Sequence, residues 1–192
     1  MYEPSFERSF SEGVDWERFA TAVDGPLQTD YLTRAKNAYE AALDLNHENV
    51  VVHINLGTVL TKLGEFEKAM EVYLRGTRLE PNHVLLFQAA NLAHNMKDER
   101  AEHFFQECIR YGGGYMARVN YGAILQVNGR FKEAEENYFA ALEGAIPDAT
   151  REQLYGYLAM MYQEMGETEK AKMYYVKVIL VQTDRIRTIT SS

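Results

Sequence analysis

The sequence predicts an all-α fold in which antiparallel helix hairpins stack on one another, because one charged, helix-forming stretch recurs along the chain. LGEFEKAMEVY at 63–73 returns as NGRFKEAEENY at 128–138 and as MGETEKAKMYY at 165–175. Weaker copies are centred on Ala35 and Ala101, and successive copies lie 32 to 37 residues apart. A period near 34 residues is typical of stacked helical-hairpin arrays.

The repeat divides the chain into about four to five units, predicted near residues 16–49, 50–83, 84–114, 115–148 and 152–182. Residues 1–29 are expected to form an N-terminal aromatic segment and a degenerate capping helix, 30–182 the array, and 183–192 a short C-terminal tail. A single hairpin is too thin to bury its own apolar face, so neighbouring hairpins are expected to stack.

Glycines mark where the helices of each hairpin are expected to cross and to turn. Gly57 and Gly122 lie in first helices, at points where a side chain would push the two helices apart. Gly64, Gly129 and Gly166 follow the first helices, where a residue in the left-handed conformation ends a helix. Large aromatic residues are expected to fill the space between neighbouring hairpins: Tyr73, Phe105, Tyr138 and Tyr175.

Together these positions resemble the tetratricopeptide repeat. In the unit at 50–83 the matching residues are Leu56, Gly57, Leu60, Gly64, Ala69, Tyr73, Gly76 and Pro81. The units at 115–148 and 152–182 keep many of these residue types, and the resemblance covers about residues 30–182. It implies a right-handed superhelical solenoid whose first helices line a concave groove.

The third unit is expected to be irregular. The segment HNMKDERA between its helices is two residues short, and YGGGY at 111–115 stands in place of the closing proline. Three consecutive glycines permit either a tight turn or a hinge between two halves of the array.

The N-terminal segment has two interpretations. Trp16 to Val23 are expected to form the first helix of the first unit, which Gly25-Pro26 ends. Phe6 and Phe10 lie four residues apart, on one face of a helix. These aromatic residues either cap the first hairpin or occupy a groove, in their own chain or in a neighbouring copy.

The last helix is expected to be covered by another surface. The terminal helix of a solenoid needs a polar outer face. Here apolar residues, among them Tyr174, Ile179 and Leu180, cover more than one face. Exposed patches of this kind mark interfaces, so we expect contact with a second protomer or with the rest of a larger protein.

The composition of the chain argues against several classes of binding partner. The net charge of -8 argues against nucleic acid and against an anionic membrane surface. No apolar run is long enough to enter and span a membrane, and the first residues do not resemble a secretory signal. A single cysteine, Cys108, excludes an internal disulfide. We therefore expect a cytoplasmic protein.

The sequence contains no motif typical of catalysis or of metal or cofactor binding. The five histidines have no metal-ligand spacing, and neither a phosphate-binding loop nor a nucleophile elbow is present. Cys108 shares a small-residue position with Gly76 and Ala141, which indicates a packing role. The sequence predicts no enzyme, no cofactor and no metal.

The resemblance implies which residues line the groove. They come from four first helices: Val51, Ile54, Asn55 and Thr58; Leu85, Gln88, Ala89 and Leu92; Met116, Val119, Asn120 and Ala123; Gln153, Gly156, Tyr157 and Met160. This mixture of apolar and amide side chains suits an amphipathic or basic segment of a protein. Some relatives clamp acidic chaperone tails with Lys, Asn and Arg. Here Val51 and Met116 stand where lysine would be, and Ala89 replaces an asparagine, so no such clamp is expected.

Three functions remain open at this point. The first is a non-catalytic adaptor that binds a peptide or helical segment in the groove. The second is a scaffold subunit that self-associates, or docks into a larger complex, through the ends of the array: Phe6, Phe10, Trp16, Tyr174, Ile179 and Leu180. The third is a small chaperone for a secreted or membrane-associated client.

Overall fold

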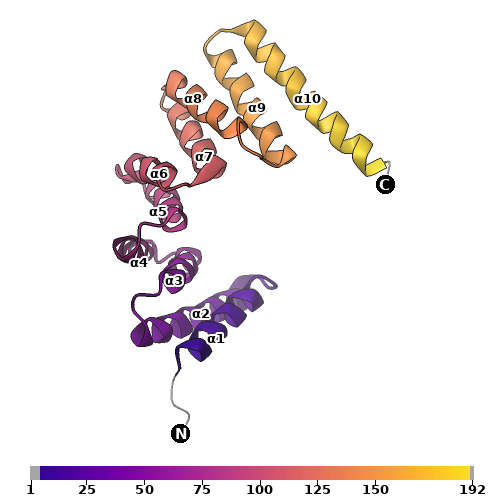
Figure 1. Cartoon of the computed structure of the whole chain (residues 1–192). Helices are drawn as coiled ribbons and strands as arrows, with labels where there is room; N and C mark the ends of the chain where they lie inside the picture. The colour runs from indigo at the N-terminus through magenta and orange to yellow at the C-terminus, as the bar shows by residue number, and fades with distance from the viewer. Residues whose placement is uncertain (1–4, 191–192) are drawn as a thin grey trace. The chain divides into compact units, whose positions relative to one another are not determined.

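Figure 1 shows the computed structural model, which describes residues 5–190, with side chains as far as Arg187. That part of the chain contains ten helices and no strand, which confirms the predicted all-α class. The helices are α1 (Phe6–Ala20), α2 (Gly25–Leu45), α3 (Val50–Lys62), α4 (Phe66–Leu79), α5 (His83–Asn95), α6 (Ala101–Arg110), α7 (Gly114–Val127), α8 (Phe131–Leu142), α9 (Asp148–Glu164) and α10 (Thr168–Thr190). None of them combines the length and the apolar character that crossing a membrane requires.

Contacts divide the chain into two compact units at Gly112 and Gly113. The N-terminal unit consists of the hairpins α1–α2, α3–α4 and α5–α6, and the C-terminal unit of α7–α8 and α9–α10. Within each unit, consecutive hairpins pack through the second helix of one and the first helix of the next.

The turns within hairpins follow the glycine pattern. Gly64, Gly129 and Gly166 have φ angles of 78°, 73° and 77°, which confirms the predicted left-handed conformation. Asn49 and Asn82 begin α3 and α5, and each side-chain oxygen accepts a hydrogen bond from a backbone N–H of the first turn. Local chemistry thus fixes where these helices begin and end.

Helix crossings explain the glycines at positions 13, 57 and 122. A Cβ atom on Gly57 would lie 2.3 Å from the ring of Tyr73, and one on Gly122 would lie 2.6 Å from the ring of Tyr138. A Cβ atom on Gly13 would likewise lie 2.5 Å from the ring of Tyr39. The hairpin α1–α2 therefore repeats the packing of α3–α4, and its first helix already begins at Phe6.

Two boundary predictions are wrong. Gly25 and Pro26 do not end the first helix; they open α2, where proline suits a first turn whose N–H groups have no helical partner. At the other end, α10 continues to Thr190, so residues 183–190 of the predicted tail are helical, and 191–192 lie outside the described residues.

In the third hairpin, Lys97 takes the place of the turn glycine. Its φ angle is 57°, and no other residue that is not glycine has a positive φ in the described chain. The N–H of Asp98 donates to the carbonyl of Ala93, as the N–H of Glu65 donates to that of Leu60 after Gly64. A left-handed conformation is strained for a residue with a Cβ atom.

We expect Lys97→Gly to raise the free energy of unfolding by about 1 kcal/mol, because glycine adopts this conformation without the steric cost. Thermal unfolding followed by circular dichroism would measure the gain. Glu99→Gly is the matched control, since it also introduces a glycine into this turn, where no residue other than Lys97 has a positive φ. A melting temperature that falls equally in both variants would contradict the assignment.

Candidate functional site

The first helices of the hairpins carry the candidate site, and their residues can be compared by counting from the crossing. We use crossing residue for Gly13, Gly57, Ala90, Gly122 and Ala159, which are all buried and lie at equivalent places in α1, α3, α5, α7 and α9. We use groove position for the residues six, three and two before a crossing residue and the one after it.

In α3, α7 and α9 the predicted residues occupy these groove positions. Val51, Met116 and Met160 are about half exposed, and Gln153 is also exposed. Val119 is an exception, because only 5% of it is exposed. The others are partly buried: Ile54, Asn55, Thr58, Asn120, Ala123, Gly156 and Tyr157.

In α5 the residues predicted to line the groove lie one position after the groove positions of that helix. Leu85, Ala89 and Leu92 are 0%, 0% and 3% exposed, so they belong to the core and not to the surface. The groove positions of this helix are instead Val84, Phe87, Gln88 and Asn91, and only Gln88 was predicted. Because Gln88 now aligns with Asn55 and Asn120, an amide and not Ala89 stands at this position. The pair of capping residues Asn49 and Asn82, which lie 33 residues apart, was the signal for the correct register.

The structure gives different roles to the residues predicted at the ends of the array. Phe10 stands at a groove position of α1, where its ring lies 5.9 Å from that of Phe6 and 6.1 Å from that of Tyr39. Trp16 stacks on Tyr31 of α2 at 5.6 Å and is therefore held within the hairpin.

Of the residues predicted on the last helix, one is buried and two are exposed. Tyr174 is only 6% exposed, because it packs against Tyr155 and Tyr162 of α9, so the prediction of an interface role for it is wrong. Ile179 and Leu180 are more than half exposed.

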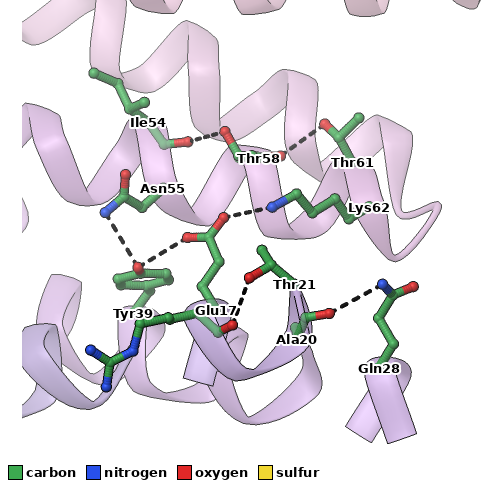
Figure 2. A network of polar contacts seen from close by, with 12 residues as sticks. Glu17, Ala20, Thr21, Gln28, Tyr39, Ile54, Asn55, Thr58, Thr61 and Lys62 are labelled. Atoms are coloured by element: carbon green, nitrogen blue, oxygen red, sulfur yellow. Dashed lines mark hydrogen bonds and ion pairs between the residues drawn. The ribbon is translucent and has the colours of Figure 1, made fainter. Parts of the chain in front are cut away.

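A polar network joins the first two hairpins beside the groove positions (Figure 2). The hydroxyl of Tyr39 donates to Glu17 and accepts a hydrogen bond from the side-chain amide of Asn55 at 3.3 Å. The ammonium of Lys62 lies 2.7 Å from the other carboxylate oxygen of Glu17. Burial and the nearby Glu17 carboxylate raise the pKa of Tyr39, which keeps the phenol protonated as a donor. Asn55 therefore helps to fix α3 against α1 and α2.

The C-terminal unit contains a hollow of about 350 Å³ between its two first helices. Its walls come from α7, the turn after α7, the first residue of α8, and α9. The residues that line it are Ala123, Gln126, Val127, Gly129, Phe131, Tyr157, Met160 and Glu164. Three of these eight, Ala123, Tyr157 and Met160, are groove positions that the sequence predicted.

Buried contacts hold this hollow in shape. The hydroxyl of Tyr138 donates to Gln126, whose side chain also lines the hollow, at 3.0 Å. The ring of Tyr157 stacks on that of Tyr138 with a centroid distance of 5.5 Å. Burial raises the pKa of Tyr138, because the charged phenolate is disfavoured away from water. The ring of Tyr157 is thus held by Tyr138, and its hydroxyl accepts a hydrogen bond from the side-chain amide of Gln153 at 2.9 Å.

The hollow carries one carboxylate. Glu164 is exposed at its wall and forms no ion pair with the described side chains, those of residues 5–187. The exposed apolar side chains beside it are Val127 and Met160. The site can therefore take an apolar group and, next to it, a positive charge.

Other groups in the described chain offer no comparable site. No cluster of three or more His, Cys, Asp or Glu residues could hold a metal ion within it. The thiol of Cys108 is fully buried and donates to the carbonyl of His83, and burial raises its pKa to about 11. This places Cys108 in the core, as its repeat position indicates.

Comparison with known sequences gives one family. Two tetratricopeptide repeat family models match the chain, over residues 31–91 and over residues 152–184. A search of curated protein sequences found no significant match.

Solved structures with the same fold share little sequence with this chain. The chain is similar to a crystal structure of MamA, with a TM-score of 0.76 at 15% identity over 97% of this chain and 99% of that one. It is also similar to BtubC (BKLC) from P. vanneervenii, with a TM-score of 0.72 at 16% identity over 95% and 93% of the two chains. A third similar structure is YrrB, described as a TPR protein with an unusual peptide-binding site, with a TM-score of 0.67 at 18% identity over 98% and 97%. These similarities show the fold, an all-α tetratricopeptide solenoid.

Proposed function

Because the chain belongs to the tetratricopeptide repeat family, we propose that it is a non-catalytic protein-interaction module that holds a peptide or helical segment of a partner protein on its first helices. The observation that carries the proposal is the hollow between α7 and α9. It combines apolar walls with a few convergent polar groups, as binding pockets do. YrrB, which has a similar fold, is described as having a peptide-binding site, and this agrees with the proposal.

The walls of the hollow indicate what it binds. An apolar side chain of the partner would contact Val127, Phe131 and Met160, and a lysine or arginine beside it would pair with Glu164. The acidic balance of the whole chain, with a net charge of -8, also favours a basic segment. The proposed partner is therefore an amphipathic, basic segment.

We expect Met160→Lys to weaken peptide binding by about tenfold or more, because it removes an apolar contact and places a positive charge next to the position of the partner's basic residue. A random-peptide library would be selected on the wild-type protein, and the affinities of the selected peptides would be measured by fluorescence polarisation. Leu79→Lys is the matched control: Leu79 is 41% exposed at the end of a second helix, away from the groove positions.

A variant of Glu164 tests whether the charge of this side chain, and not its size, contributes to peptide binding. Glu164→Gln keeps the size of the side chain and removes its charge, so it should weaken basic peptides most at low salt. Selected peptides that bind both the Met160 and the Glu164 variant as tightly as the wild type would place the binding site elsewhere and contradict the proposal.

A further inference from the structure

Gln126 makes a contact within its hairpin that recurs along the chain. It stands four residues after the crossing residue Gly122, and its side-chain oxygen accepts a hydrogen bond from the hydroxyl of Tyr138 at 3.0 Å. Residues at the same place in other first helices contact the tyrosine hydroxyl of their own hairpin: Glu17 at 3.2 Å, Thr61 at 3.5 Å and Gln163 at 2.8 Å. This contact joins the two helices of a hairpin, but in a glutamine it uses only the carbonyl end of the amide.

The hydrogen bond with Tyr138 fixes which way the amide of Gln126 points. Tyr138 is fully buried, and its hydroxyl has no other acceptor among the described residues. If the amide were turned around, its nitrogen would face the hydroxyl and the buried O–H group would lose its acceptor, which is costly. The oxygen of Gln126 therefore faces Tyr138, and the NH2 group points away from it.

This NH2 group is a donor without an acceptor. Gln126 is only 8% exposed, yet no described residue accepts a hydrogen bond from its side-chain nitrogen. Among the described side chains, Nε2 of His53 is the one fully enclosed polar atom that lacks a partner, so the nitrogen of Gln126 keeps contact with solvent. Because Gln126 lines the hollow, this contact lies in the hollow.

The hollow thus presents two polar groups of opposite kind. The donor of Gln126 lies on a buried part of the wall, and the carboxylate of Glu164 on an exposed part. A ligand that displaces water from the hollow must give Gln126 an acceptor, because a donor left unpaired on binding lowers affinity. The ligand therefore needs an oxygen atom in addition to its apolar and basic groups.

A peptide offers such an oxygen at every residue, in its main-chain carbonyl. Within an α-helix these carbonyls are already bonded to N–H groups of the same helix, so a helical segment laid across the hollow would leave Gln126 unpaired. An extended segment keeps its carbonyls free and directs every second side chain to the same surface. The donor of Gln126 therefore favours an extended segment.

We propose that Gln126 recognises a main-chain carbonyl oxygen of the bound partner, and that the segment held at the hollow is extended there and not helical. This inference rests on the proposed function, because it specifies how a segment is held at the same site. Gln126 would then determine specificity, a role that the repeat spacing does not reveal, since its free donor depends on the buried contact with Tyr138.

A double-mutant cycle between protein and peptide tests this contact. The probes are the selected library peptides whose affinity falls with Met160→Lys and Glu164→Gln. Each amide bond of such a peptide is replaced in turn by a trans-alkene, which has no carbonyl oxygen. One replacement should weaken binding to the wild type by about five- to tenfold. On Gln126→Met, which keeps the length of the side chain and has no donor, the same replacement should change the affinity by less than about twofold.

Gln163→Met is the matched control, because Gln163 also accepts a hydrogen bond from a tyrosine hydroxyl but does not line the hollow. This variant should bind the peptides as the wild type does and keep the full effect of the alkene. Circular dichroism would check the fold of both variants. A measurement on the wild type alone gives a second test: transferred nuclear Overhauser effects should show an extended bound peptide.

Three results would each overturn the inference. The first is an alkene effect of equal size on the wild type and on Gln126→Met, the second a coupling to Gln126 that comes from an asparagine or glutamine side chain of the peptide, and the third a helical bound peptide. In all three cases Met160→Lys and Glu164→Gln would still weaken binding, so the proposed function would stand. If no selected peptide depends on Met160 and Glu164, the proposed function is contradicted and this inference with it.

Discussion

Gly57→Ala should destabilise the N-terminal unit by about 1–3 kcal/mol, the usual range for overpacked cores. The added Cβ would lie 2.3 Å from Cε1 of Tyr73 and 2.6 Å from its Cδ1. Tyr73 cannot move aside easily, because it is 2% exposed and its hydroxyl contacts Thr58 and Thr61. Alanine normally favours a helix over glycine by up to about 1 kcal/mol, so the clash must exceed this gain.

Gly156→Ala provides a matched control, since Gly156 also lies within a first helix. No atom lies within 4 Å of a Cβ built on Gly156. This substitution should therefore stabilise the chain by about 0.5–1 kcal/mol through helix propensity alone. Urea unfolding followed by circular dichroism would compare the two variants. If both shift the midpoint in the same direction, the crossing at Gly57 is not as tight as the structure indicates.

Leu85→Ala should cost about 2–5 kcal/mol, the usual range for a leucine removed from a packed core. Leu85 is fully buried, and its methyl groups fill the space next to Gly76 of α4. The same measurement on Val84→Ala should show a change within about 0.5 kcal/mol, as is usual for surface sites. Val84 precedes Leu85 in sequence and is 37% exposed.

This pair of variants also decides the register of α5. The alignment by period alone makes Leu85 a surface residue at a groove position, whereas the structure buries it and exposes Val84. A large effect at Val84 together with a small one at Leu85 would favour the alignment by period over the structure.

The local features of the fold were predictable because each rests on one residue and its close neighbours. Gly64 and Gly166 end helices through their own backbone conformation. Gly57 and Gly122 indicate tight crossings because a glycine stands at the same place in two of the repeats. In the site, Ala123, Tyr157 and Met160 were found in the same way, since the units that contain them keep the repeat spacing.

The predictions from sequence were wrong in the hairpin that lacks the repeat's glycines. The third hairpin has Lys97 in place of the turn glycine and Ala90 in place of the crossing glycine, so the glycine pattern did not fix its register, and only the capping asparagine Asn82 marked it. Gly13 is recognisable as a crossing residue only through its contact with Tyr39, which lies 26 positions away.

By itself, the sequence determined that this protein is all-α, that its hairpins repeat about every 34 residues, and where most of them turn, because helix periodicity and glycine geometry are local properties. Only the tertiary structure decided which side chains face solvent. Tyr174 is buried and Tyr175 exposed, although both are tyrosines on one helix, because α9 covers one and no described residue covers the other to the same extent. The hollow arises in the same way, from α7 and α9 meeting across about thirty residues of chain. Burial depends on which elements meet in space, and the sequence pattern within one repeat does not contain that information.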